Sequence, residues 1–233
     1  MLISSYRLLL YDPVAFIFLS LLIIVAILVA ISVHEFSHAL AANILGDKTA
    51  TSLGRLTLNP WKHIDPTGIC MLLVAGFGWG KPVPVDSRNL VVGRIGIFLV
   101  ALAGPLSNLI LAFLLAIPIK LGFWPWQDPA LLNPTLLLRG GAVSSIGDIA
   151  SMVIFFNLLL AIFNLIPLIP LDGAKMVEGL VPRNYLQGYH RVVRFGPILL
   201  ISMVLIDITF HVGLLWSIIG VPLALLVRIS VGI

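Results

Sequence analysis

Long apolar runs alternate with short polar loops along the whole chain. Each run is long enough for a helix that crosses the ~30 Å hydrocarbon core of a bilayer at ~1.5 Å per residue. The pattern therefore predicts an all-α polytopic membrane protein. The four main runs cover about Val14–Leu45, Val91–Leu121, Ser145–Ile166 and Pro197–Ile229.

The last run is too long for one simple crossing. It contains Asp207, His211, Gly213, Gly220 and Pro222, which interrupt an otherwise apolar stretch. Glycine and proline weaken or break a helix, so the run forms either one kinked helix or two short ones. We therefore expect about four to six transmembrane helices, all within a single domain that covers residues 1–233.

Residues 46–90 have a different pattern, with glycine and proline at many positions. Arg55–Leu58 and Pro82–Val85 alternate between apolar and other residues, which is typical of short strands. We expect a small membrane-associated β-hairpin or sheet within residues 50–90. Residues 67–80 are apolar but too short and glycine-rich to span, and they suit a re-entrant or interfacial segment.

Composition agrees with a membrane protein, because 60% of the residues are hydrophobic and only 10% are charged, against about 25% in soluble domains. The net charge of +4 does not indicate nucleic-acid binding, since the lysines and arginines lie in short loops between apolar runs. Ten of the 14 lie on the side of the 46–94 and 171–195 loops. By the positive-inside rule, this side is expected to face the cytoplasm.

The first apolar run contains the most informative motif, His34-Glu35-Phe36-Ser37-His38. Residues four apart share one helix face, so both imidazoles can bind one metal ion and Glu35 can act as a general base beside it. Ionisable residues inside an apolar helix are unfavourable unless they face a cavity and have a function. The alternative is a buried polar cluster that only joins helices.

A hydrolytic zinc site needs a third protein ligand. Asp172 is the best candidate, because it follows a Pro167–Pro170 break at the end of an apolar run and matches the depth of His38. Its alternative role is to cap the following helix. Asp207 and His211 form an incomplete pair that suits a helix break better than a metal site. The remaining acidic and histidine candidates were Asp65, Asp86, Asp148, Glu178, His63 and His190.

In these motifs the chain resembles the site-2 protease family of intramembrane metalloproteases, which is peptidase family M50, and in particular its compact prokaryotic branch. The patterns that carry the resemblance are His34–His38, Gly54–Pro60 with its His63–Gly68 continuation, Gly78–Val85, Ala103–Asn108 and Asn164–Gly173. The family often carries a PDZ domain or a CBS pair, but the 46–90 and 122–141 loops are too short to hold either.

The resemblance implies that His34, His38 and Asp172 hold one zinc ion per chain. It also implies that Glu35 is the general base. The same resemblance places Asn108 near the zinc, where its amide would hold a substrate carbonyl or the oxyanion. Taken without the resemblance, Asn108 is a helix-packing residue beside a Gly-Pro kink.

The strand-like residues 50–60 and 80–88 would pair with an unwound substrate by β-augmentation, with Gly54 and Arg55 in the substrate-binding region. The zinc is expected within the cytoplasmic leaflet, reached by a polar channel. Asp172, His63 and Asp65 are candidates to line that channel, although His63 is more simply explained as a solvated loop residue.

The resemblance further implies a substrate that is a single-span membrane protein or a signal-peptide remnant, with accessory proteins as further partners beside the lipid bilayer. Two other functions remain open from the sequence. One is a catalytically inactive relative that binds membrane helices as a scaffold, and the other is a metal transporter, although transporters usually show repeated halves.

Overall fold

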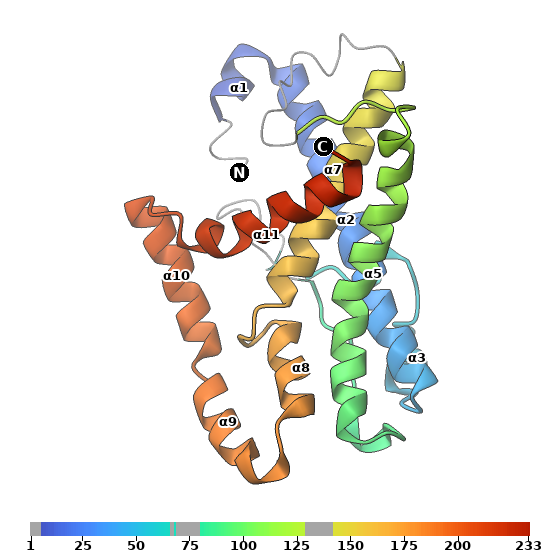
Figure 1. The fold of residues 1–233 in the computed structure, drawn as a ribbon, viewed down its shortest axis with the longest axis vertical. Coiled ribbons are helices and arrows are strands. Elements are labelled where there is room, and N and C mark those ends of the chain that lie inside the picture. Colours follow the sequence, from blue (N-terminus) through green and yellow to red (C-terminus); the bar gives the residue numbers. More distant parts are fainter. Residues whose placement is uncertain (1–5, 66–67, 69–79, 129–141) are drawn as a thin grey trace.

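The computed structural model describes residues 6–65, 68, 80–128 and 142–233, and these residues are mainly helical (Figure 1). The longer helices are α2, α5, α7, α10 and α11, and short helices connect them. In chain order the α-helices are α1 (Tyr6–Tyr11), α2 (Pro13–Ile44), α3 (Thr49–Ser52), α5 (Arg94–Lys120), α7 (Ala142–Asn164), α8 (Asp172–Leu180), α9 (Leu186–Val193), α10 (Gly196–Phe210) and α11 (Leu214–Val231).

Five segments in the described residues are long and apolar enough to cross a membrane, by length and composition. The predicted multi-pass helical architecture is therefore confirmed. The segments are Pro13–Ile44, Arg94–Lys120, Ser145–Asn164, Arg183–Asp207 and Leu214–Val231.

The last apolar run forms two helices, α10 and α11. The chain breaks at His211 and Gly213, which have positive φ values of 54° and 72°. The Asp207 carboxylate accepts hydrogen bonds from the backbone N–H groups of Leu214 (2.5 Å) and Leu215 (2.9 Å). Asp207 thus satisfies the free N–H groups at the start of α11. His211 is exposed, so this pair forms a helix break, as the sequence favours.

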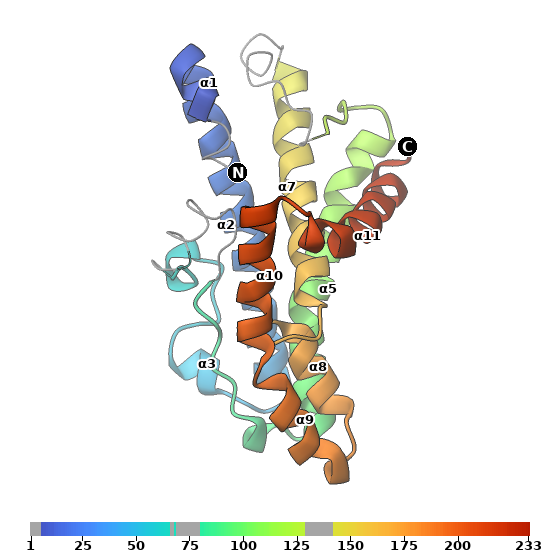
Figure 2. The same cartoon turned by 90° about the vertical axis from the view of Figure 1, so that its left-hand side faces the viewer.

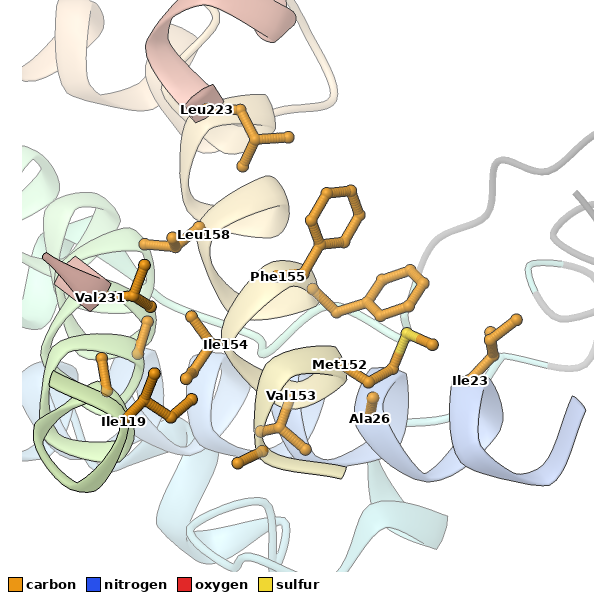
Figure 3. Close-up of a cluster of buried hydrophobic side chains, with 14 of the residues drawn as sticks. Ile23, Ala26, Ile119, Met152, Val153, Ile154, Phe155, Leu158, Leu223 and Val231 are labelled. Carbon is orange, nitrogen blue, oxygen red and sulfur yellow. The ribbon is translucent and has the colours of Figure 1, made fainter. Parts of the chain in front are cut away.

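The core is formed by α2, α5 and α7, with α11 packed across α5 and α7 (Figures 1 and 2). Helix α7 is the central element, because 72% of its apolar window is buried, against 22–33% in the other four candidate spans. Figure 3 shows its large side chains packed against residues of α2, α5 and α11. Small residues such as Ala26 and Ala112, both fully buried, let the helices approach closely, which is typical of membrane bundles.

The loops on either side of α3 and the α8–α9 segment lie at the same end of the molecule, away from α1 (Figures 1 and 2). The charge pattern predicts this placement of the 46–94 and 171–195 loops on one side. Helix α8 packs against α5, and the chain then turns through α9 into α10, which stands apart from α5 in Figure 1.

The β-hairpin expected within residues 50–90 is wrong for the described part of this region. It contains α3, two 3-10 turns at Pro60–Lys62 and Ser87–Asn89, and one isolated bridge between Ile64 and Gly80. Pro82 and Pro84 have no N–H to donate to a ladder, which disfavours a strand there. The expected re-entrant segment at 67–80 falls almost entirely outside the described residues.

Candidate metal centre

His34 and His38 lie one helical turn apart on α2 and point to the same side. Their ring centroids are 4.6 Å apart with planes at 89°, and both side chains are buried. The structure thus confirms that the spacing of the motif brings the two imidazoles together.

Asp172 reaches the same point from a distant part of the chain. It begins α8 directly after the turn that ends α7, and its Oδ2 lies 2.9 Å from His34 Nε2 and 3.0 Å from His38 Nε2. Gly173 allows this close turn, because a Cβ there would overlap the Ile166 carbonyl. Within the described residues, His34, His38 and Asp172 are the set of three with ligand atoms close enough to hold a metal ion.

The other nitrogen of each imidazole has its own partner on α5. His38 Nδ1 lies 2.6 Å from the Val100 carbonyl, and His34 Nδ1 lies 2.6 Å from Asn108 Oδ1. A carbonyl oxygen only accepts, so His38 carries its proton on Nδ1. Asn108 uses its NH₂ group to donate to the Ala30 carbonyl at 3.0 Å, so its oxygen faces His34, which donates as well.

These partners determine what the centre can bind. Because Nδ1 of each ring donates to its partner on α5, Nε2 of each ring is the atom that faces the Asp172 carboxylate. A metal ion between them would be bound by two Nε2 lone pairs and one carboxylate oxygen. Three ligands about 2.0 Å from one tetrahedral zinc lie about 3.3 Å apart, so the observed spacings of 2.9 and 3.0 Å need only small adjustments. The residues fit a zinc ion with nitrogen and oxygen ligands.

Gly104 on α5 forms the wall behind the imidazoles, a role that the sequence analysis did not identify. A Cβ at this position would lie 2.5 Å from His38 Nε2 and 2.7 Å from His34 Cε1. Only glycine leaves room for both rings. Gly104 belongs to the Ala103–Asn108 motif, but the sequence does not show why glycine is needed there, because that need depends on where α2 packs against α5.

Glu35 lies beside the ligands, on the wall of a cavity of about 720 Å³ that also contacts His34, His38 and Asp172. Its Oε2 accepts a hydrogen bond of 3.0 Å from the Val83 N–H. This bond fixes the carboxylate next to the metal ligands without making it one of them. The position is compatible with the general-base role that the motif predicts, and that role stays a prediction.

Lys175 adds a positive charge beside the centre, on the wall of the cavity. Its ammonium lies 3.8 Å from Asp172 Oδ1, the carboxylate oxygen that faces away from the histidines, and its side chain is half exposed. It follows Asp172 by three residues on α8, so the helix places it on the same face.

Arg55 binds the backbone of the segment that follows Gly80. It is buried and donates from one guanidinium nitrogen to the carbonyls of Lys81 (2.8 Å) and Pro82 (2.9 Å). It therefore holds the segment that contacts Glu35. Gly54 is exposed with a φ of 64°. Neither residue lines the cavity, and their contact with a substrate stays a prediction.

Asn108 is fully buried and is not among the cavity-lining residues. Its oxygen faces His34, and its NH₂ group faces Ala30 and Asn157. The structure thus places it behind a metal ligand, and its expected contact with a substrate carbonyl stays a prediction.

The remaining acidic and histidine candidates do not join the ligand set. Asp65 lines the cavity, as expected. The expectation that His63 is solvated is wrong, because it is fully buried and its Nε2 lies 2.7 Å from the Thr57 carbonyl. Asp148 is buried on α7, and Glu178 pairs with His190 at 3.0 Å.

Asp47 anchors the far end of the segment that contacts Glu35. It is fully buried and accepts hydrogen bonds from the Asp86 N–H (2.8 Å), the Asn89 amide (3.0 Å) and Thr49. Burial alone would raise the pKa of Asp47, but these donors hold that pKa below its ordinary value. The ionised carboxylate therefore joins the end of α2 to residues 86–89.

The sequence of this chain is similar to a family of peptidases and to proteins named as zinc metalloproteases. The model of a family described as "Peptidase family M50" matches residues 132–204, which include Asp172. The "Putative zinc metalloprotease YwhC" of Bacillus subtilis (strain 168) is 43% identical over 161 residues, which are 69% of each chain.

More distant relatives carry a similar name. The "Putative zinc metalloprotease Rip2" of Mycolicibacterium smegmatis is 30% identical over 71% of this chain and 60% of its own length. Rip2 of Mycobacterium tuberculosis (strain H37Rv) is 33% identical over 72% of this chain and 60% of its own length. No solved structure gives a significant match.

Proposed function

Because the chain belongs to peptidase family M50, we propose that it is a zinc metalloprotease that hydrolyses peptide bonds within the transmembrane segments of other membrane proteins. The observation that carries this proposal is the meeting of two imidazoles, one carboxylate and a separate glutamate in one cavity among apolar helices. Three protein ligands and a neighbouring base are the arrangement that hydrolytic zinc sites use.

His34, His38 and Asp172 would hold one zinc ion per chain. Zinc, when bound, supplies Lewis acidity, which polarises a substrate carbonyl and makes water a stronger acid. The Nδ1 contacts on α5 keep both histidines in the tautomer that offers Nε2 to a cation.

Glu35 would remove the proton from the attacking water and later deliver it to the leaving amide nitrogen. Its position suits both transfers, because it lines the cavity beside the ligands and its carboxylate is held by the Val83 N–H. A glutamate that is not a ligand keeps its basicity for proton transfer.

The cavity walls favour an apolar substrate. Apolar side chains of two helices line the cavity, namely Leu160 and Phe163 of α7 and Pro197, Leu200 and Ile201 of α10. A membrane helix hides its peptide bonds in internal hydrogen bonds, so it must unwind locally before cleavage. We infer that the backbone of residues 80–85, which forms no helix, offers its remaining polar groups to such an unwound segment.

The substrates would be single-span membrane proteins or signal-peptide remnants, with accessory proteins as further partners. The centre lies near the end of the molecule that carries most of the lysines and arginines, which favours a cytoplasmic entrance. His34 follows about 30 Å of helix from the start of α2, so the zinc would lie in the inner leaflet.

The test is zinc quantification on the purified chain, together with cleavage of a single-span substrate in detergent or vesicles, with and without a chelator. We expect one zinc per chain and cleavage that stops on chelation and returns with zinc. Bound zinc without cleavage would favour a scaffold, and zinc flux into sealed vesicles would favour a transporter. A chain that binds no zinc would refute the proposal.

A further inference from the structure

We propose that Asn157 is a positioning residue for the metal centre, acting through Asn108 on the proton of His34. The inference rests on the proposed function, since it concerns how this chain prepares a ligand for zinc. Asn157 contacts neither the ligand atoms nor the cavity. Its role follows from a directed series of hydrogen bonds that crosses from α7 through α5 to α2.

Asn157 lies on the most buried helix of the molecule. It is fully buried between Phe156 and Leu158 in an apolar stretch. A side-chain amide at such a position must satisfy its hydrogen bonds within the protein. Each end of its amide has a hydrogen-bond partner, Val153 on α7 and Asn108 on α5.

The series has three bonds beyond the metal ligand. Asn157 donates from Nδ2 to the Val153 carbonyl at 2.8 Å. Its Oδ1 accepts from Asn108 Nδ2 at 2.6 Å. Asn108 Oδ1 in turn lies 2.6 Å from His34 Nδ1, and His34 Nε2 faces Asp172.

The direction of these bonds is fixed at the Asn157 end. The Val153 carbonyl can only accept, so the NH₂ group of Asn157 must face it and its oxygen must face Asn108. Asn108 then presents its NH₂ group to Asn157 and its oxygen to His34. His34 must place its proton on Nδ1, which leaves the Nε2 lone pair for zinc.

A second acceptor supports the same orientation of Asn108. The Ala30 carbonyl also receives a hydrogen from Asn108 Nδ2, at 3.0 Å. Removal of Asn157 therefore weakens the orientation of the amide without reversing it. Mutation of a residue that hydrogen-bonds a metal ligand typically lowers metal affinity by about 10- to 100-fold. Asn157 is one residue further from the ligand, so we expect its loss to lower zinc affinity by about tenfold, near the lower end of that range.

A merely structural role would appear differently. If Asn157 only joins α7 to α5, its loss would lower the stability of the bundle and leave the affinity of the folded protein for zinc unchanged. Ser151 provides the matched control, because it is also fully buried on α7 and its hydroxyl accepts from the Gln127 N–H at 3.1 Å, away from this series.

The experiment measures zinc affinity by competition with a chromophoric chelator. It also records the visible spectrum of the Co²⁺-loaded protein. Thermal unfolding of the metal-free protein is the stability control. Asn157→Leu should weaken zinc binding about tenfold and alter the cobalt spectrum. Ser151→Ala should leave both unchanged. Asn157→Asp keeps an acceptor for Asn108 and should stay within about threefold of the unmodified chain. Asn157→Ala also removes the acceptor, and it tests the same loss of zinc affinity if Asn157→Leu does not fold.

A double-mutant cycle tests whether Asn157 acts on zinc affinity through Asn108. If Asn157 acts through Asn108, then Asn157→Leu should cause no further loss of zinc affinity in an Asn108→Leu background. Unchanged affinity on removal of the acceptor at position 157, or an equal loss with and without Asn108, would overturn the positioning role and leave the proposed protease intact. Absence of zinc binding by the unmodified chain would instead refute the proposed function.

Discussion

The backbone of Gly104 lies against the imidazole of His38, so closely that a single added carbon would lie 2.5 Å from Nε2. Ordinary carbon–nitrogen contacts are about 3.5 Å or longer. The ring atom in question is the one that faces Asp172. Helix α5 therefore sets the position of the ligand atom, although it provides no ligand itself.

Gly104→Ala should displace both imidazoles and lower zinc affinity by about 10- to 100-fold, the range found for residues that support metal ligands. Cleavage should fall in parallel. The matched control is Gly188→Ala on α9, where an added Cβ would meet nothing within 4 Å. Zinc titration of both variants checks the prediction, and equal affinities would contradict it.

Glu35→Gln should leave zinc bound and abolish most cleavage. Glutamine keeps the size of the side chain and an oxygen that can accept from the Val83 N–H, but it cannot take a proton from water. Loss of a general base lowers rates by about 10²- to 10⁴-fold. A variant with normal zinc content and a normal rate would remove Glu35 from the mechanism.

Asp172→Ala should remove zinc from the purified protein, because it leaves only His34 and His38 to hold the ion. We expect a loss of affinity greater than the roughly 100-fold that outer partners cause. Asp207→Ala is the control: it deletes the acceptor for the Leu214 and Leu215 N–H groups and should cost about 1 kcal/mol of stability. Its zinc content, measured by mass spectrometry, should be unchanged.

Arg55→Lys should loosen the segment that holds Glu35. Lysine keeps the charge but carries it as a strongly hydrated ammonium on a flexible stem, which should hold the Lys81 and Pro82 carbonyls less firmly than the single guanidinium nitrogen that donates to both. We expect a loss of about 1–3 kcal/mol and faster hydrogen exchange at the Lys81 and Val83 amides. Arg88→Lys, on an exposed side chain, should change neither quantity. Normal exchange in the Arg55 variant would show that the segment is held by other contacts.

Asp47→Asn should change how stability depends on pH. The pKa of Asp47 is held below its ordinary value of 3.8, so the unfolded chain takes up this proton more readily than the folded one. The ionised carboxylate therefore stabilises the fold above about pH 4, and this contribution is lost as the pH falls through the folded pKa. The asparagine variant should be less stable near pH 7, by about 1–3 kcal/mol. It should also lose less stability on acidification, as measured by thermal unfolding between pH 3 and 7.

Local spacing predicted much of the site. His34 and His38 meet because a helical turn separates them, and Asp172 was identified from a proline break at a matching depth. The contributions of Gly104 and of the Val100 carbonyl could not be predicted, because they depend on how α5 packs against α2. The alternation of residues 82–85 suggested a strand, but arginine and proline in this region replace ladder hydrogen bonds with side-chain contacts.

The two histidines differ in what supports them, and this affects how the enzyme can change over evolutionary time. His38 donates to a main-chain oxygen, which every amino acid at position 100 supplies. His34 donates to a side chain, which a single codon change at position 108 can delete. A substitution at position 108 can therefore weaken zinc binding by about 10- to 100-fold while His34, Glu35, His38 and Asp172 all remain encoded.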